Sequence, residues 1–142
     1  MTVQTILAGR DGTVHHASGE DTVGTIVVRL NERRIGAVPV IEDGRVVGIF
    51  SERDVIHCLA SHGAAALDLL VRDVMTSPAI TISSDTGVLA GLSLMTRRRI
   101  RHLPVVDRDR LVGFISIGDL VKHRIEKIEA EAAAMRDYIA GS

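Results

Sequence analysis

The amino-acid sequence predicts a mixed α/β (α+β) protein made of two tandem repeats and ending in a long helix. Three observations indicate this fold class. At a shift of 65 positions, residues 13–56 match residues 78–121 at 12 of 44 pairs without a gap. Each copy reads as strand, helix, strand, strand, helix, and residues 119–140 contain no Gly or Pro. Because a repeat at a fixed period marks copies of one structural unit, the elements can be assigned copy by copy.

In the first copy, the short runs rich in β-formers predict strands at Thr13–Ala17, Ala37–Ile41 and Val46–Phe50. Between the first two strands, apolar residues at positions 23, 26, 27 and 30 recur at helical spacing. The turn residues Asp43-Gly44 predict a tight hairpin between the last two strands. A second helix is expected at Glu52–Ser61, where the apolar residues again recur at helical spacing.

The second copy repeats this order. Its expected elements are strands at Ala79–Ile82, Leu103–Val106 and Leu111–Ile115 and helices at Gly87–Arg98 and Gly118–Arg124. We therefore expect a first repeat with a lead-in segment over residues 1–62, a connector over 63–70, a second repeat over 71–124 and a C-terminal helix over 125–142. A unit of about 60 residues is marginally stable alone, so the two halves are expected to share a core.

The C-terminal segment has its own apolar pattern. The residues that alternate four and three positions apart are Val121, Ile125, Ile128, Ala132, Met135 and Ile139. This is the spacing of a heptad seam. Two interpretations stay open at this point: a helix that packs on its own domain or on a partner subunit, and a frayed tail.

Composition excludes several classes of protein. The 142 residues carry a net charge of −1, so no global field draws the chain to nucleic acid or to anionic membrane. Only three aromatic residues are present, too few for a base-stacking platform. Cys58 is the single cysteine and fits a reducing compartment. No apolar run reaches the length of a membrane span and no signal-peptide layout is visible, so a cytoplasmic protein is expected.

The repeated polar motif Ser-x-x-Asp is the strongest candidate for a binding site. Ser51 and Asp54 follow a strand and begin a helix, and Ser116 and Asp119 do the same in the second copy. Free N–H groups at a helix start favour an anion such as phosphate, and a carboxylate one turn later can accept hydrogen bonds from a ribose diol. The alternative is a capping box, in which the same residues satisfy the helix end. The spacing alone does not separate the two, since it also occurs at residues 18–21.

Taken together, these residues resemble a known family. The runs IGAVPVIEDGRVVGIFSERDV (residues 35–55), IRHLPVVDRDRLVGFISIGDL (100–120) and MTSPAITI (75–82) are similar to a pair of cystathionine-β-synthase (CBS) domains, a Bateman module. The similarity extends over nearly the whole chain and is greatest to small stand-alone bacterial proteins with no catalytic domain. It implies two repeats packed sheet to sheet about a pseudo-twofold axis, a regulatory homodimer and no enzyme activity.

The resemblance also implies ligands and site residues. The clefts of such modules bind AMP, ADP, ATP, NAD or S-adenosylmethionine, and no other cofactor is expected. Asp54 and Asp119 take the place of the ribose-binding Asp, and Ser51 and Ser116 that of the phosphate-side hydroxyl. The residues implied around the base are Gly36, Ala37 and Val38 in the first repeat and Arg101, His102 and Leu103 in the second. Thr81 is implied at the wall of the second cleft, where the first repeat has His16 instead, which is a departure from the pattern.

The two clefts are expected to be unequal. Arg101 can grip phosphate in bidentate fashion, and together with Thr81 it is expected to complete the second cleft, so that loss of Asp119 or Ser116 weakens binding more than loss of Asp54. Arg53 lies one turn into a helix, where the dipole disfavours a cation, and indicates an anionic ligand or simply a solvated side chain.

Two other functions remain as alternatives. One is a structural module with vestigial clefts that assembles through its C-terminal helix. The other, less favoured, is nucleic-acid binding through the basic run Arg97–Arg101. The six His show no ligand-like spacing with acidic residues, and no catalytic Ser–His or Cys–His arrangement is legible, so neither a metal site nor an enzyme is expected.

Overall fold

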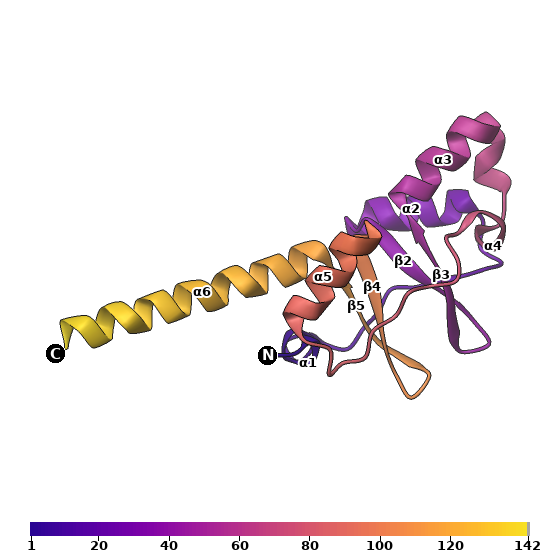
Figure 1. Cartoon of the computed structure of the whole chain (residues 1–142). Coiled ribbons are helices and arrows are strands. Elements are labelled where there is room, and N and C mark those ends of the chain that lie inside the picture. The colour runs from indigo at the N-terminus through magenta and orange to yellow at the C-terminus, as the bar shows by residue number, and fades with distance from the viewer. Residues whose placement is uncertain (142) are drawn as a thin grey trace.

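The computed structural model, which describes residues 1–141, has an α+β body with one long helix projecting from it (Figure 1). The elements before that helix are α1 (Val3–Leu7), β1 (Ala17–Ser18), α2 (Val23–Arg33), β2 (Ala37–Glu42), β3 (Arg45–Ser51), α3 (Glu52–His62), the 3-10 turn η1 (Gly63–Asp68), α4 (Val71–Val74), α5 (Val88–Arg98), β4 (His102–Asp107) and β5 (Arg110–Ser116). The projecting helix is α6 (Ile117–Ala140). This confirms the predicted fold class of small sheets, helices and a long C-terminal helix.

The first sheet has the order β1-β2-β3, with β1 parallel to β2 and β2 antiparallel to β3. Asp43 and Gly44 both have positive φ, of 52° and 75°, as a tight hairpin requires. The expected first strand at Thr13–Ala17 is shorter and lies at Ala17–Ser18. Residues 13–15 do not join the sheet and instead line a pocket between the halves.

The second sheet corrects the expectation of three strands in each repeat. It contains β4 and β5 in antiparallel register, and the predicted strand Ala79–Ile82 is reduced to one parallel bridge between Ile82 and Val105. Pro78 has no N–H to donate to a ladder. Ser84 directs its N–H and its hydroxyl to the Asp107 carboxylate, at 3.0 and 2.6 Å, so the backbone leaves the sheet directly after Ile82.

The helices lie where the apolar spacing predicts them. On α2, Val23, Ile26 and Leu30 are buried, and Thr22 caps the helix by accepting a hydrogen bond from the Thr25 N–H. The helices predicted at residues 52–61 and 87–98 are α3 and α5, with ends shifted by one residue. The connector forms η1, whose Ala66 is fully buried, so it is an ordered part of the first half.

The two halves do not share one core, and this corrects the sequence expectation. One buried cluster surrounds Phe50 and contains residues of β1, α2, β2 and β3, and the other surrounds Leu103 and Ile115. The two clusters are linked by exchanged lead-in helices. Val3 of α1 is buried in the second cluster, and Val71 of α4 is buried in the first. Each half therefore depends on a helix that precedes the other half in sequence.

Backbone hydrogen bonds hold both exchanged helices in equivalent ways. The Val3 and Gln4 N–H groups donate to the carbonyls of Thr86 and Ser84, at 2.8 and 2.9 Å. On the other side, the Val71 and Arg72 N–H groups donate to Asp21 and Gly19, at 2.8 and 3.1 Å. The lead-in segment at residues 1–7 was expected to belong to the first repeat, and the structure places it on the second.

Helix α6 runs without a break from the second repeat to the C-terminal end. The helix expected at residues 118–124 and the C-terminal helix expected at 125–142 are continuous within the described residues, because α6 is one helix of 24 residues. Leu120 is the one fully buried residue of α6; the first turns of the helix pack on the body, and its C-terminal part projects from it (Figure 1). No helix in residues 1–141 is both long and apolar enough to cross a membrane.

Candidate functional site

The two Ser-x-x-Asp motifs form capping boxes at the starts of α3 and α6. In the first, the Asp54 N–H donates to Ser51 Oγ at 3.4 Å and the Ser51 N–H donates to Asp54 Oδ2 at 2.9 Å. In the second, the Asp119 N–H donates to Ser116 Oγ at 3.1 Å and the Ser116 N–H donates to Asp119 Oδ2 at 2.8 Å. The capping interpretation is therefore confirmed. A carboxylate still offers further acceptor positions, so capping does not exclude a ligand.

Each capping box opens into a pocket formed by both halves of the molecule. The Asp119 pocket has a volume of about 450 Å³ and joins Ser116 and Asp119 to Gly36 and Ala37, at the start of β2. The Asp54 pocket has about 580 Å³ and joins Ser51 and Asp54 to residues 98–102, before and at the start of β4. Both volumes lie in the range of small-molecule sites. In both pockets, the helix start of one repeat faces the first central strand of the other.

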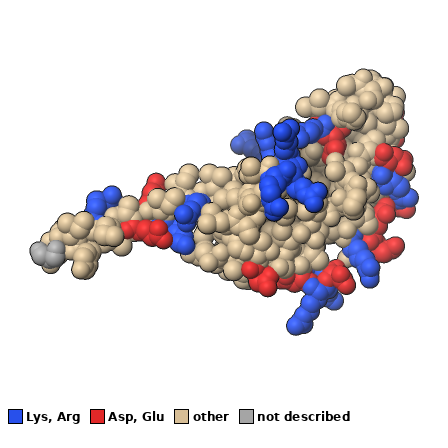
Figure 2. Space-filling view, in the orientation of Figure 1, with Lys and Arg blue, Asp and Glu red and all other residues tan. Residues whose placement is uncertain are grey.

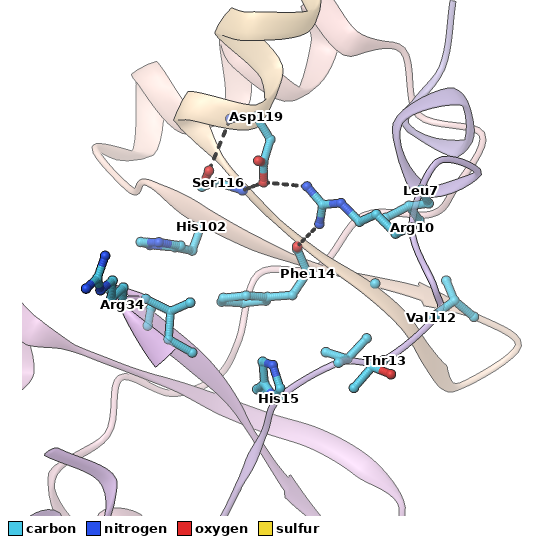
Figure 3. Close-up of a pocket in the computed structure, with 16 residues that line it drawn as sticks. Leu7, Arg10, Thr13, His15, Arg34, His102, Val112, Phe114, Ser116 and Asp119 are labelled. Atoms are coloured by element: carbon cyan, nitrogen blue, oxygen red, sulfur yellow. Dashed lines mark hydrogen bonds and ion pairs between the residues drawn. The ribbon is translucent and has the colours of Figure 1, made fainter. Parts of the chain in front are cut away.

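The Asp119 pocket contains an ion pair that the sequence did not indicate. Arg10 follows α1, which packs on the second repeat, and its side chain points toward Asp119 (Figure 3). One terminal nitrogen lies 2.8 Å from Asp119 Oδ2 and the other donates to the Phe114 carbonyl at 2.9 Å. Burial, the largest single influence, raises the pKa of Asp119, but the Ser116 N–H and Arg10 together hold it below its ordinary value. The carboxylate is thus kept charged, with Arg10 as its resident partner.

The Asp54 pocket carries more positive charge. Four arginines line it, Arg53, Arg98, Arg99 and Arg101, against the two carboxylates Glu52 and Asp54. Figure 2 shows Lys and Arg side chains gathered where α5 ends in Figure 1. Asp54 Oδ1 accepts a hydrogen bond from the Thr76 hydroxyl at 2.9 Å, so a neutral donor stands where the other pocket has Arg10.

Gly36 and His102 line both pockets and form the wall between them. The His102 ring stacks on Phe114 with centroids 5.5 Å apart and planes 8° from parallel (Figure 3). Burial lowers the pKa of His102, and Arg101 lowers it further, while Asp119 and Glu52 act in the opposite direction. The imidazole is therefore neutral near pH 7 and presents an apolar, stacked face to the pockets.

Two arginines occupy equivalent strained positions beside the pockets. Arg34 ends α2 with φ of 54°, and Arg99 ends α5 with φ of 55°. This left-handed conformation is the one that glycine usually supplies after a helix. Arg34 lines the Asp119 pocket and Arg99 the Asp54 pocket. Each pocket thus receives one arginine from a helix end of the opposite repeat, at a cost in backbone energy.

The predicted site residues divide into two groups. Those that line at least one of the two pockets are Gly36, Ala37, Ser51, Arg53, Asp54, Arg101, His102, Ser116 and Asp119. Val38 and Leu103 are buried in the two cores and line neither pocket in the described structure. If these two residues contact a base, as the resemblance implies, they can do so only through their backbone atoms.

Two placements differ from the expectation. Arg101 was expected to complete the pocket of Asp119, but it lines the pocket of Asp54, because the start of each central strand faces the other repeat's helix. Thr81 is exposed and lines neither pocket, since the strand that would have carried it inward is not formed. The premise that made the second cleft the stronger one is therefore wrong. His16 lines a smaller third cavity of about 200 Å³, and its neighbour His15 lines the Asp119 pocket.

Sequence reasoning missed several pocket residues: Arg10, Thr13, His15, Arg34, Thr76, Arg98 and Arg99. The repeat offered one usable signal, since Arg34 and Arg99 are identical at a shift of 65. No comparable signal marked Arg10 or Thr76, because both belong to exchanged lead-in segments. Within residues 1–141, no group of three His, Cys, Asp or Glu side chains is arranged to hold a metal ion.

Comparison with known proteins gives consistent matches. The model of the CBS domain family matches residues 13–61 and 71–126. A curated relative, the mitochondrial CBS domain-containing protein CBSX3 of Arabidopsis thaliana, is 32% identical over 136 residues, covering 92% of this chain and 66% of the relative. An uncharacterized protein of Methanopyrus kandleri is 32% identical, covering 86% of this chain and 65% of its own. The chain thus spans about two thirds of the length of these relatives.

Solved structures agree in fold. A CBS-domain containing protein of Agrobacterium tumefaciens has a TM-score of 0.82 and 36% identity, covering 87% of this chain and 92% of its own. A putative signal-transduction protein with CBS domains from Burkholderia ambifaria has a TM-score of 0.83 and 32% identity, covering 89% and 95%. The CBS domain pair of a third protein, solved in complex with 5′-methylthioadenosine and S-adenosyl-L-methionine, has a TM-score of 0.76 and 23% identity, covering 86% and 98%. At that identity the likeness concerns the fold alone.

Proposed function

We propose a regulatory, non-catalytic role for this chain, which belongs to the CBS domain family and carries a pair of these domains. In this role, its two pockets bind adenosine-containing ligands. One observation carries the proposal. Each pocket brings the Ser and Asp of a helix start in one repeat against the first central strand of the other. A ligand with a ribose at the carboxylate and a base at the strand would contact both repeats at once.

The polar groups of each pocket suit the parts of such a ligand. Asp54 and Asp119 can accept hydrogen bonds from a ribose diol, and the N–H groups at the starts of α3 and α6 favour phosphate. The neutral, stacked His102 and Phe114 offer a flat surface beside the Asp119 pocket, against which a base can pack. The fold relative with 5′-methylthioadenosine and S-adenosyl-L-methionine supports the ligand class for this architecture, although not for this sequence.

The charges favour different ligands in the two pockets. The Asp54 pocket has four arginines, none of which forms an ion pair with a carboxylate within residues 1–141, and it is the better site for a nucleoside di- or triphosphate. The Asp119 pocket is smaller, and Arg10 is already paired with Asp119, so it suits a ligand with one phosphate or none. This reverses the ranking expected from the sequence. Three arginines of the basic run, Arg98, Arg99 and Arg101, line the Asp54 pocket, which favours a role in ligand binding over one in nucleic-acid binding.

Calorimetry and thermal shift with AMP, ADP, ATP, NAD and S-adenosylmethionine test the proposal. A ligand at 100 times its Kd is expected to add about 2.7 kcal/mol of stability. Asp54→Asn should weaken ATP, and Asp119→Asn should weaken AMP or S-adenosylmethionine, because asparagine retains one acceptor for the cap but cannot accept both hydroxyls of a diol. The absence of any shift with all five ligands at millimolar concentration would refute it.

The chain offers a matched control for these variants. Asp21 accepts a hydrogen bond from the Ser18 N–H at 2.8 Å, in the same Ser-x-x-Asp spacing, but lines neither pocket in the described structure. Asp21→Asn should therefore leave all affinities unchanged. A loss of affinity in this variant as large as in Asp54→Asn would show that the effect comes from local folding and not from ligand contact.

A further inference from the structure

Helix α6 carries an apolar seam that faces solvent. Within it, the exposed fractions are 41% for Val121, 49% for Ile125, 48% for Ile128 and 60% for Met135. The face of α6 that packs on the body is a different one, since it carries the buried Leu120 and the half-buried His123, Arg124 and Lys127. A second helix can therefore reach the seam without displacing the body. Exposed apolar rows of this kind mark interaction surfaces.

We propose that α6 pairs with α6 of a second copy of this chain as a short, parallel, in-register coiled coil. The seam residues occupy the a and d positions of the heptad, with Ile125 at a and Ile128 at d. The charged residues beside the seam then fall at the e and g positions, which set orientation and partner choice in coiled coils. These positions hold Lys122, Arg124, Glu129, Glu131 and Arg136.

The charge pattern fits the parallel arrangement. In a parallel pair, a g residue faces the e residue five positions later on the other helix. Arg124 then faces the partner's Glu129, and Glu131 faces the partner's Arg136. Both pairs join opposite charges, and the symmetry of a homodimer repeats each of them.

The same pattern opposes the antiparallel arrangement. The antiparallel register that still matches every apolar layer sets Ile128 against the partner's Ala132. It brings Glu129 opposite the partner's Glu129 and Glu131 opposite the partner's Glu131. It also brings Lys122 opposite the partner's Arg136, so that each of these pairings is repulsive. The charges therefore favour a second copy of this chain as the partner of α6, and they favour the parallel direction.

The shape of the molecule suits this dimer. Helix α6 leaves the body at its N-terminal end and projects away from it (Figure 1), so a parallel pair sets the two bodies side by side at one end. The part beyond residue 124 has space for only about two heptads, and helices of that length are marginal alone. We therefore expect a dimer that dissociates on dilution. It leaves both pockets open, because α6 contributes only its first turn to the Asp119 pocket.

Sedimentation equilibrium of the full chain tests the charge register. Glu131→Arg should raise the dimer Kd by about tenfold, because two attractive pairs become repulsive. The double variant Glu131→Arg/Arg136→Glu should restore the dimer, because it exchanges the charges and keeps them opposite. Asp137→Arg makes the same charge change at an f position, away from the seam, and should have no effect. Failure of the double variant to restore the dimer would overturn the proposed register.

Two further variants test whether the two helices run parallel and whether the partner is a second copy of this chain. Glu131→Gln should weaken a parallel dimer by removing an attraction, whereas it would tighten an antiparallel one, so tightening overturns the proposal. Met135→Cys should form a disulfide-linked dimer under mild oxidation, since equivalent d residues adjoin only in a parallel pair. Cys58 is buried, so the unmodified chain serves as the control that should not cross-link. A wild-type chain that stays monomeric at every concentration would also overturn the proposal.

Discussion

Replacing Arg99 with glycine is expected to stabilise the fold and, in the same variant, to weaken the binding of a nucleoside triphosphate. Arg99 ends α5 with φ of 55°, in the left-handed region. A residue with a Cβ pays about 1–2 kcal/mol to adopt this conformation. Glycine avoids that cost but loses about 0.5–1 kcal/mol through the greater freedom of its unfolded chain. The net expectation is about 0.5–1 kcal/mol of added stability.

The same variant is expected to bind ATP more weakly, although its fold is more stable. Arg99 lines the Asp54 pocket, and the resolved contacts give its guanidinium no ion pair with a carboxylate. For an exposed guanidinium that meets a phosphate, we expect about 1 kcal/mol, or about a fivefold change in Kd. The affinity for ATP should fall by this factor. The affinity for adenosine should not change, because adenosine has no phosphate for the side chain to contact.

Arg99→Ala separates the two effects. Alanine removes the guanidinium but keeps the Cβ, so this variant should lose ATP affinity without gaining stability. Urea denaturation should show a higher midpoint with an unchanged slope for Arg99→Gly only, and calorimetry should show weaker ATP binding for both. Arg97→Ala is the control for a nonspecific effect of positive charge, because Arg97 lies at the same helix end but does not line the Asp54 pocket. Equal midpoints for the glycine and alanine variants would refute the backbone argument, and unchanged ATP affinity would refute the phosphate contact.

Two other predictions concern the Asp119 pocket and the wall between the pockets. Arg10→Ala should tighten adenosine binding by up to about fivefold, because an ion pair at this exposure is worth about 0.2–1 kcal/mol and the variant has no such pair with Asp119 to break. Calorimetry measures this change. Arg29→Ala is the control, because the pair between Arg29 and Asp21 lies outside the Asp119 pocket. Weaker binding would mean that Arg10 contacts the ligand directly. Because the pKa of His102 is lowered in the folded state, the unfolded chain takes up the proton first, so the free energy of unfolding should fall as the pH drops below 6.5. His102→Asn should reduce the difference in melting temperature between about pH 7.5 and 5.5, and an equal difference in both proteins would contradict this.

The sequence was sufficient to predict the repeat, most helices and the two helix starts that carry Ser and Asp. These features are local: apolar spacing, turn residues and capping residues act within a few positions of each other. The second sheet was predicted less well, because a strand forms only if its neighbours accept its hydrogen bonds. Ser84 and Asp107 form a competing contact that no short window reveals.

The composition of each pocket could not be predicted, because it depends on how the two repeats cross. A shift of 65 positions shows that Asp54 and Asp119 are equivalent, but not which strand start each one faces. The conformation of Arg34 and Arg99 was hidden for a related reason. Glycine usually signals a left-handed helix end, and here arginine occupies both positions.

The crossed arrangement also determines how the pockets can influence each other. Gly36 and His102 belong to different repeats, and both line both pockets. A Cβ built on Gly36 would lie 3.6 Å from His102 Cε1 and 3.6 Å from Glu52 Oε2, so these groups adjoin at the wall between the pockets. A ligand in one pocket that moves the His102 ring changes the wall of the other. Because coupling between two ligands is reciprocal in binding free energy, we expect a ligand that moves His102 in one pocket to change the affinity of the other pocket by the same factor as the second ligand changes its own.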